Sequence, residues 1–64
     1  MQKIKVTFVK DGKWWVAYTY DITGAMAQGT TMDEAEKNLL EIIKDLKGYK
    51  DVFIADRLVN RSTD

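Results

Sequence analysis

Residues 14–35, WWVAYTYDITGAMAQGTTMDEA, constrain the fold more than any other part of this 64-residue chain. They predict a strand with apolar residues on both faces, a turn at residues 21–24, a short strand, and the start of a capped helix. A strand that is apolar on both faces must be covered on both sides, and the one evident helix can cover only one of them. We therefore expect a second protein chain to cover the other face.

The composition excludes several kinds of active site. The chain contains no cysteine and no histidine, so disulfides, the usual zinc sites and Ser-His or Cys-His nucleophile pairs are ruled out. No apolar run approaches the ~20 residues of a membrane span, and the N-terminus lacks the apolar core of a signal peptide. Formal net charge is zero, which gives no electrostatic argument for nucleic acid or membrane. We expect a small cytoplasmic domain without a cofactor, stabilised in part by association.

The charges are unevenly distributed along the chain. Residues 1–20 carry four lysines and one aspartate, whereas residues 21–47 carry six acidic residues and three lysines. We interpret this asymmetry as two solvated faces rather than as a binding patch.

A β-hairpin is predicted at the N-terminus. Polar and apolar residues alternate over residues 3–9, which is the period of a half-buried strand. Residues 10–13, KDGK, have the composition of a turn, and residues 14–20 are rich in the aromatic and β-branched residues of a returning strand.

Two registers of this hairpin remain open. A two-residue loop at Asp11 and Gly12 places Phe8 opposite Trp15, and four residues then lie away from the core: Trp14, Val16, Tyr18 and Tyr20. A three-residue loop with Gly12 as a bulge places Phe8 opposite Trp14, and the residues away from the core become Trp15, Ala17 and Thr19. Either register leaves one tryptophan on the far face.

A short third strand at residues 25–28, ended by Gly29, leads into the helix. Thr31 is the expected N-cap, and Glu34 three residues later can complete a capping box. An apolar stripe of helical spacing follows at positions 32, 35, 39, 42/43 and 46, and Gly48 marks the end of the helix.

The C-terminal part of the chain allows two readings. The apolar run at residues 52–55 favours a fourth strand, although Ile54, Ala55, Leu58 and Val59 would also fit one face of a short helix. We expect a single domain over residues 1–59 and a frayed tail over residues 60–64.

Acidic residues are the only candidates for catalysis. Four of them lie on the predicted helix, where capping and solvation account for them: Asp33, Glu34, Glu36 and Glu41. Asp21 lies beside a glycine turn, where a local Asx-type hydrogen bond would explain it. Metal-dependent nucleases need several carboxylates converging from adjacent strands, and residues 4–9 contain none. We expect no enzymatic activity and no metal site.

The aromatic residues are the candidate binding residues: Trp14, Trp15, Tyr18 and Tyr20. Tryptophan and tyrosine are enriched at protein interfaces. Beside Lys3 and Lys5 they could instead stack the bases of single-stranded RNA. Because the net charge is zero, the protein interface is favoured.

In order and spacing, these motifs resemble the HicB-like antitoxin domain of toxin–antitoxin systems. The family pattern runs roughly D-G-x-[YW]-x-V-A, then P-D-L-P-G-C, then G-x-T-x-E-E-A. The resemblance covers about residues 3–46, and Tyr20 and Thr23 replace the two prolines while Ala25 replaces the cysteine. The matching residues are Asp11, Gly12, Trp14 or Trp15, Val16, Ala17, Asp21, Gly24, Gly29, Thr31, Glu34 and Ala35.

The resemblance implies a β-β-β-α-β domain similar to a truncated ribonuclease H fold without its carboxylate centre. Members of the family bind and block HicA-type toxins, small ribonucleases that cleave mRNA, and they usually oligomerise. Many also carry a C-terminal segment that binds DNA. Only about sixteen residues follow Gly48 here, so we do not expect DNA binding.

From residues and resemblance together, we expect an α+β domain in which one helix covers one face of a small, mainly antiparallel sheet. Its expected function is to form homo-oligomers and to neutralise a HicA-type toxin by occlusion. The alternatives are a small RNA-binding sheet, a vestigial nuclease that uses Asp21, and a solitary HicB-like domain with another partner.

Overall fold

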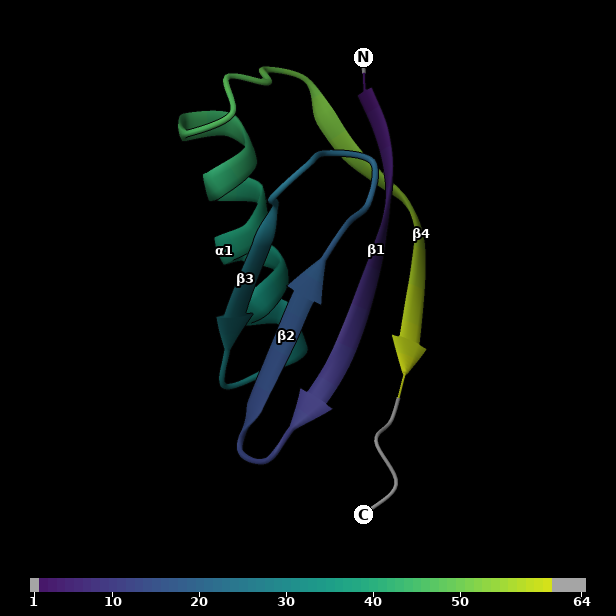
Figure 1. Cartoon of the computed structure of the whole chain (residues 1–64), viewed down its shortest axis with the longest axis vertical. Coiled ribbons are helices and arrows are strands. Elements are labelled where there is room, and N and C mark those ends of the chain that lie inside the picture. The colour runs from purple at the N-terminus through teal and green to yellow at the C-terminus, as the bar shows by residue number, and fades with distance from the viewer. Residues whose placement is uncertain (1, 61–64) are drawn as a thin grey trace.

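The computed structural model describes residues 2–60, and its fold is the predicted α+β fold (Figure 1). The strands β1 (Gln2–Asp11), β2 (Trp14–Tyr18) and β3 (Met26–Gly29) come first. The helix α1 (Met32–Asp45) and the strand β4 (Val52–Asn60) follow. The β-β-β-α-β order is therefore confirmed, and residues 52–60 are a strand rather than a helix.

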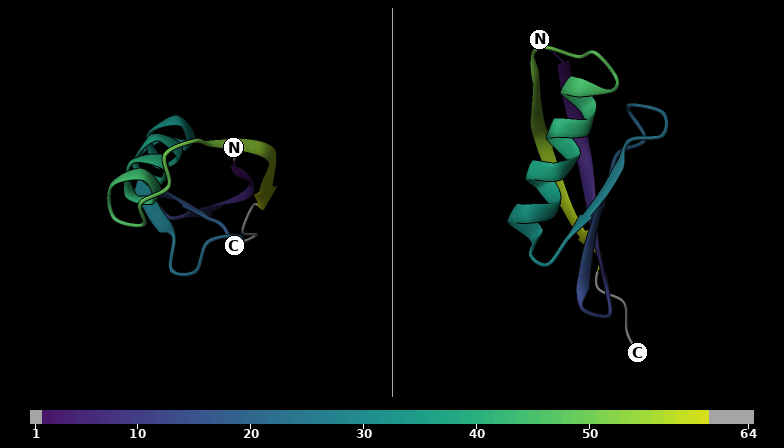
Figure 2. Two further views of the ribbon diagram at one scale, coloured as in Figure 1. Left: turned by 90° about the horizontal axis from the view of Figure 1, so that it is seen from above. Right: turned by 90° about the vertical axis from the view of Figure 1, so that its left-hand side faces the viewer.

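One four-stranded sheet of order β3-β2-β1-β4 forms the body of the domain. The pairs β1–β2 and β2–β3 are antiparallel, and β4 runs parallel to β1. The parallel pair requires a crossover connection, which runs from β3 at one edge of the sheet through α1 and its loops to β4 at the other edge. Figure 2 shows that α1 lies on one side of the sheet only.

The hydrophobic core lies between α1 and the sheet. Its fully buried side chains come from β1, β2 and α1: Ile4, Val6, Phe8, Ala17, Ala35, Leu39 and Ile43. Ile22 and Ala25, in the loop after β2, close one end of the core. Leu46 was expected in the apolar stripe of the helix, but it caps the helix and is 78% exposed, so the buried stripe ends at Ile43.

The observed hairpin register differs from both predicted ones. Asp11 pairs with Trp14, and Phe8 pairs with Ala17. The turn therefore consists of Gly12 and Lys13, and Asp11 belongs to the strand. Gly12 has φ 61°, as the first central residue of a type II′ hairpin turn requires. Compared with the predicted two-residue loop, the partner of Phe8 moves by two residues, from Trp15 to Ala17. An even shift leaves each strand residue on the same face, so the faces assigned by that alternative are kept.

The start of the helix is a capping box, as predicted, with one difference. The Glu34 amide donates to the Thr31 hydroxyl over 3.0 Å. The Glu34 carboxylate accepts from the Thr30 amide over 2.7 Å and from the Thr30 hydroxyl over 3.1 Å. The returning bond thus reaches the residue before the N-cap, which ties the β3–α1 connection to the first helical turn.

This arrangement predicts a pH dependence of stability. Hydrogen bonds from the Thr30 amide and hydroxyl, together with Lys37, lower the pKa of Glu34 below 4.5. A lowered pKa in the folded state stabilises the fold above the unfolded-state pKa, and this contribution is lost as pH falls through the folded value. In urea titrations, we expect wild type to be more stable than Glu34→Gln at pH 7. The difference should shrink below about pH 4.5. A difference in unfolding free energy between wild type and Glu34→Gln that stays constant down to pH 2 would contradict this prediction.

Gly29 allows α1 to approach β3 closely. A Cβ atom at this position would lie 2.7 Å from the backbone nitrogen of Ala35 and 2.9 Å from the carbonyl carbon of Glu34. The contact continues along the helix, where the Asn38 side-chain amide donates to the Gln28 carbonyl over 2.9 Å. The glycine in the G-T-T-M-D-E-A motif thus has a packing role that its sequence context did not reveal.

The loop between β2 and β3 is fixed to β1 by Asp21. Its carboxylate accepts from the Lys5 amide over 2.7 Å, and the Asp21 amide donates to the Thr19 hydroxyl over 3.1 Å. The expected local Asx-type explanation of Asp21 is therefore incomplete, because its carboxylate bonds a strand sixteen residues away. The pairing of β1 with β2 ends at Thr7 and Tyr18. The Asp21 carboxylate therefore accepts a hydrogen bond from a β1 amide that β2 does not reach.

The strand β4 contains a β-bulge. Ile54 pairs with Ile4 and Asp56 with Lys5, so Ala55 is the extra residue. Arg57 reaches from β4 to Glu36 on α1, with Nε–Oε1 at 2.8 Å. The strand extends to Asn60, one residue into the predicted tail, and residues 61–64 lie outside the described part of the chain.

Candidate interaction face

The side of the sheet opposite α1, called the open face here, has no second layer of secondary structure within residues 2–60. Because Ile4, Val6 and Phe8 are buried against the helix, the alternating residues of each strand point the other way. The strand registers place these residues on the open face: Lys3, Lys5, Thr7, Val9, Asp11, Trp14, Val16, Tyr18, Met26, Gln28, Phe53, Asp56, Leu58 and Asn60.

Apolar and aromatic side chains are prominent on the open face. Trp14 is 46% exposed and Leu58 is 63% exposed, with Met26 and Phe53 also exposed. Val9, Val16, Tyr18 and the methyl-bearing Thr7 are half-buried between them. Exposed patches of this kind mark interaction sites more often than solvated surface. The predicted strand with two apolar faces is thus present, and the helix covers only one of them.

Three of the four predicted aromatic residues gather on or beside the open face. Trp14 and Tyr18 belong to it through β2, and Tyr20 follows in the loop, 88% exposed. The rings of Tyr18 and Tyr20 meet edge to face, with centroids 5.3 Å apart. The side-chain interaction with Tyr18 raises the pKa of Tyr20 above its ordinary value.

Trp15, the fourth predicted residue, lies on the helix side of the sheet. It packs against the core and pairs with Lys10 across the hairpin. The Lys10 Nζ atom lies 5.3 Å from the Trp15 ring centroid, a cation–π contact. Of the two tryptophans that the hairpin register left open, Trp14 therefore lies on the open face and Trp15 on the helix side, because neighbouring residues of a strand point to opposite faces.

Two hollows interrupt the open face. One, of about 400 Å³, is lined by residues of β1, β4 and the β2–β3 loop: Lys5, Thr7, Tyr20, Asp21, Asp56 and Leu58. The other, of about 430 Å³, lies toward β3 and is lined by Asp11, Val16, Met26, Ala27 and Gln28. Both combine apolar walls with one or more carboxylates, which suits the side chains of a protein partner.

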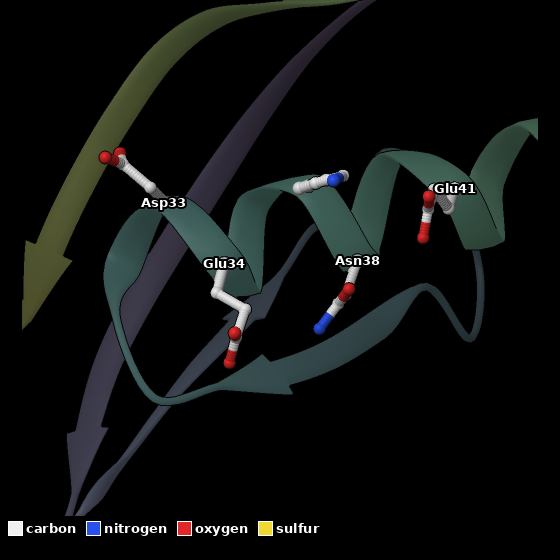
Figure 3. Close-up of a pocket in the computed structure, with 5 residues that line it drawn as sticks. Asp33, Glu34, Asn38 and Glu41 are labelled. Atoms are coloured by element: carbon white, nitrogen blue, oxygen red, sulfur yellow. The ribbon is translucent and has the colours of Figure 1, made fainter.

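A third hollow lies on the outer surface of α1, with a volume of about 420 Å³ (Figure 3). Glu34 and Asn38 point from it toward β3, where they make the capping and strand contacts described above. Asp33 and Glu41 project from other positions along the helix. The predicted explanation of these acidic residues by capping holds for Glu34. Glu36, outside this hollow, pairs with Arg57.

Within residues 2–60, no cluster of three or more acidic side chains could hold a metal ion. In the same range, no helix is long and apolar enough to cross a membrane. Asp21, the residue proposed for a vestigial nuclease, has its carboxylate bonded to the Lys5 amide.

Phe53, Leu58 and Met26 were not predicted as interface residues. In β4, Phe53 and Leu58 lie five positions apart, and regular alternation would place residues at such an odd spacing on opposite faces. The bulge at Ala55 restores them to the same face. Leu58 and Val59 are both exposed, as expected for an edge strand. Two adjacent apolar residues at the end of β4 were the only feature of the sequence that could have indicated an interaction surface there.

The fold and this face define a class: a small α+β domain with one sheet face covered by a helix and the other exposed and aromatic. Searches of protein-family models, of curated proteins and of solved structures each found no significant match.

Proposed function

We propose that this chain is a non-catalytic protein-binding module that acts as a HicB-type antitoxin. The open face is its binding surface, and a HicA-type ribonuclease is the partner that it neutralises by occlusion. The observation that carries the proposal is the apolar and aromatic sheet face, over which residues 2–60 form no second layer. Its residues Trp14 and Tyr18 are of the types that dominate binding energy at protein interfaces.

Two further observations support this proposal. The element order agrees with the β-β-β-α-β order that the resemblance implies, while similarity to a truncated ribonuclease H fold remains a prediction. The motif residues also have defined roles: Gly29 packs on the helix, Thr31 and Glu34 cap it, and Asp21 anchors a loop. A motif that builds the scaffold leaves partner contact to the exposed side chains around it.

The proposal is tested with a HicA-type ribonuclease from the same genome, by measuring mRNA cleavage as this chain is added. We expect the chain to inhibit cleavage. Trp14→Ala or Tyr18→Ala should weaken inhibition by about 30-fold, the effect of losing an interface residue worth about 2 kcal/mol. Leu46→Ala, an exposed apolar residue on the helix, is the control and should inhibit like wild type. Full inhibition by both open-face variants would contradict the proposal.

RNA is a second candidate ligand for the open face, because Lys3 and Lys5 lie on it together with Tyr18. Asp56 pairs with Lys5 across the strands, and Asp21 lines the same hollow, so the charge there is balanced. Binding of single-stranded RNA that weakens steeply with salt and is lost in Tyr18→Ala would favour this candidate.

A further inference from the structure

We propose that the hollow on the β3 side of the open face binds an arginine side chain of the protein partner. This inference rests on the proposed function of the open face in protein binding, and it names the type of residue through which the partner is held.

The lining of this hollow combines apolar and polar side chains from three neighbouring strands. Its volume is about 430 Å³, and it is lined by Asp11, Val16, Met26, Ala27 and Gln28. The half-buried Val16 and the exposed Met26 make its apolar part, and the exposed Asp11 and Gln28 make its polar part. An arginine side chain has the same division, because an apolar stem of three methylene groups carries a charged end.

The charge of the hollow favours a cation. Among the described residues that line it, one is acidic and none is basic. The other hollow of the open face differs, since Lys5 lies beside its carboxylates. Lys10, the residue before Asp11, has its Nζ atom over the Trp15 ring on the helix side of the sheet. Within residues 2–60 the Asp11 carboxylate has no ion-pair partner, so it can accept a cation from another chain.

The spacing of the polar groups favours arginine over lysine. Asp11 on β1 and Gln28 on β3 are separated by β2, which sets their strands about 10 Å apart. A guanidinium group donates from several edges at once and can bond both side chains, whereas an ammonium group is a compact charge. The Gln28 backbone carbonyl already accepts from Asn38, which leaves the side-chain amide of Gln28 for the ligand.

Trp14 stands beside the polar part of the hollow. It pairs directly with Asp11 and is 46% exposed on the open face. Side chains of directly opposite residues in a sheet lie close enough to contact a common group. A guanidinium group held by Asp11 can therefore also stack on the Trp14 ring, a contact that arginine makes more often than lysine.

An NMR titration of the labelled full chain with N-acetyl-arginine amide tests the hollow without any toxin. We expect saturable shifts at the amides of Val16, Met26 and Gln28 and at the Trp14 indole, with a dissociation constant in the millimolar range that suits so small a ligand. N-acetyl-citrulline amide, which has nearly the same shape without the charge, should bind about ten-fold more weakly or less. Equal binding of the citrulline probe would overturn the proposal, and equal binding of N-acetyl-lysine amide would overturn the choice of arginine.

Two matched variants identify the carboxylate. Asp11→Asn removes the charge at nearly constant shape and should raise the dissociation constant of the arginine probe about ten-fold or more. Asp56→Asn removes a carboxylate of the other hollow and should bind the probe like wild type. The dispersion of the amide resonances shows whether each variant is folded. Wild-type affinity of folded Asp11→Asn, or loss of binding in folded Asp56→Asn, would overturn the location of the site.

The same variants connect the hollow with the proposed function. In the mRNA-cleavage assay, Asp11→Asn should weaken inhibition about ten-fold, and Asp56→Asn should inhibit like wild type. The two proposals fail separately. Full inhibition by Asp11→Asn would overturn only the capture of an arginine, and a chain that binds the arginine probe but leaves the toxin active would overturn only the antitoxin function.

Discussion

Replacing Gly29 by alanine is expected to destabilise the domain by about 3 kcal/mol, the upper range for forcing atoms into a packed site. The added Cβ would lie within 3 Å of three atoms of the first helical turn, two of them backbone atoms. Backbone cannot rotate away as a flexible side chain can, so β3 and α1 would have to separate. Urea unfolding at a fixed protein concentration measures the effect, since association also changes apparent stability.

Gly12→Ala is the matched control for this substitution. A Cβ at Gly12 meets nothing within 4 Å, so the cost there is limited to the left-handed backbone, about 1–2 kcal/mol. If Gly29→Ala cost no more than Gly12→Ala, the close approach of helix and strand would not limit the fold.

Phe8→Ala is expected to cost about 3–5 kcal/mol, because Phe8 is fully buried and its removal leaves a cavity in the core. A domain of 64 residues has a total stability of roughly 3–10 kcal/mol at 0.05–0.15 kcal/mol per residue. The variant should therefore lose most of its stability, and a large fraction of the molecules should be unfolded at 25 °C.

The control for Phe8→Ala is Leu46→Ala, a comparable truncation at an exposed position, which should change stability by no more than about 0.5 kcal/mol. Thermal and urea unfolding followed by circular dichroism measure both variants. Similar midpoints for the two would show that Phe8 does not hold the core together.

The helix was predictable because its determinants are local. Thr31 and Glu34 lie three residues apart, and their bonds form within one turn. Ala35, Leu39 and Ile43 follow at helical spacing and are buried. The prediction that Leu46 is buried was wrong, because the apolar stripe alone does not show whether the sheet extends far enough to cover the last turn of the helix.

The hairpin and the open face depend on pairing between segments, which the sequence determines less directly. Asp11 is a favoured turn residue, but the turn type that has glycine first leaves Asp11 in the strand. This register determines that Trp14 lies on the open face and Trp15 on the helix side. In β4, the bulge at Ala55 breaks the two-residue period, so no alternation pattern could place Phe53 and Leu58 on one face.

The parallel pairing of β4 with β1 has a consequence for the order of folding. Strands β1, β2 and β3 connect through short segments, whereas Gln2 and Val52 pair across fifty positions of the chain. Closing so long a loop is entropically costly, and contacts of high sequence separation slow folding. We therefore infer that β4 joins the sheet last. Because β4 is one of the two edge strands and joins last, it should also open before the whole domain unfolds, and hydrogen exchange in β4 should then precede global unfolding.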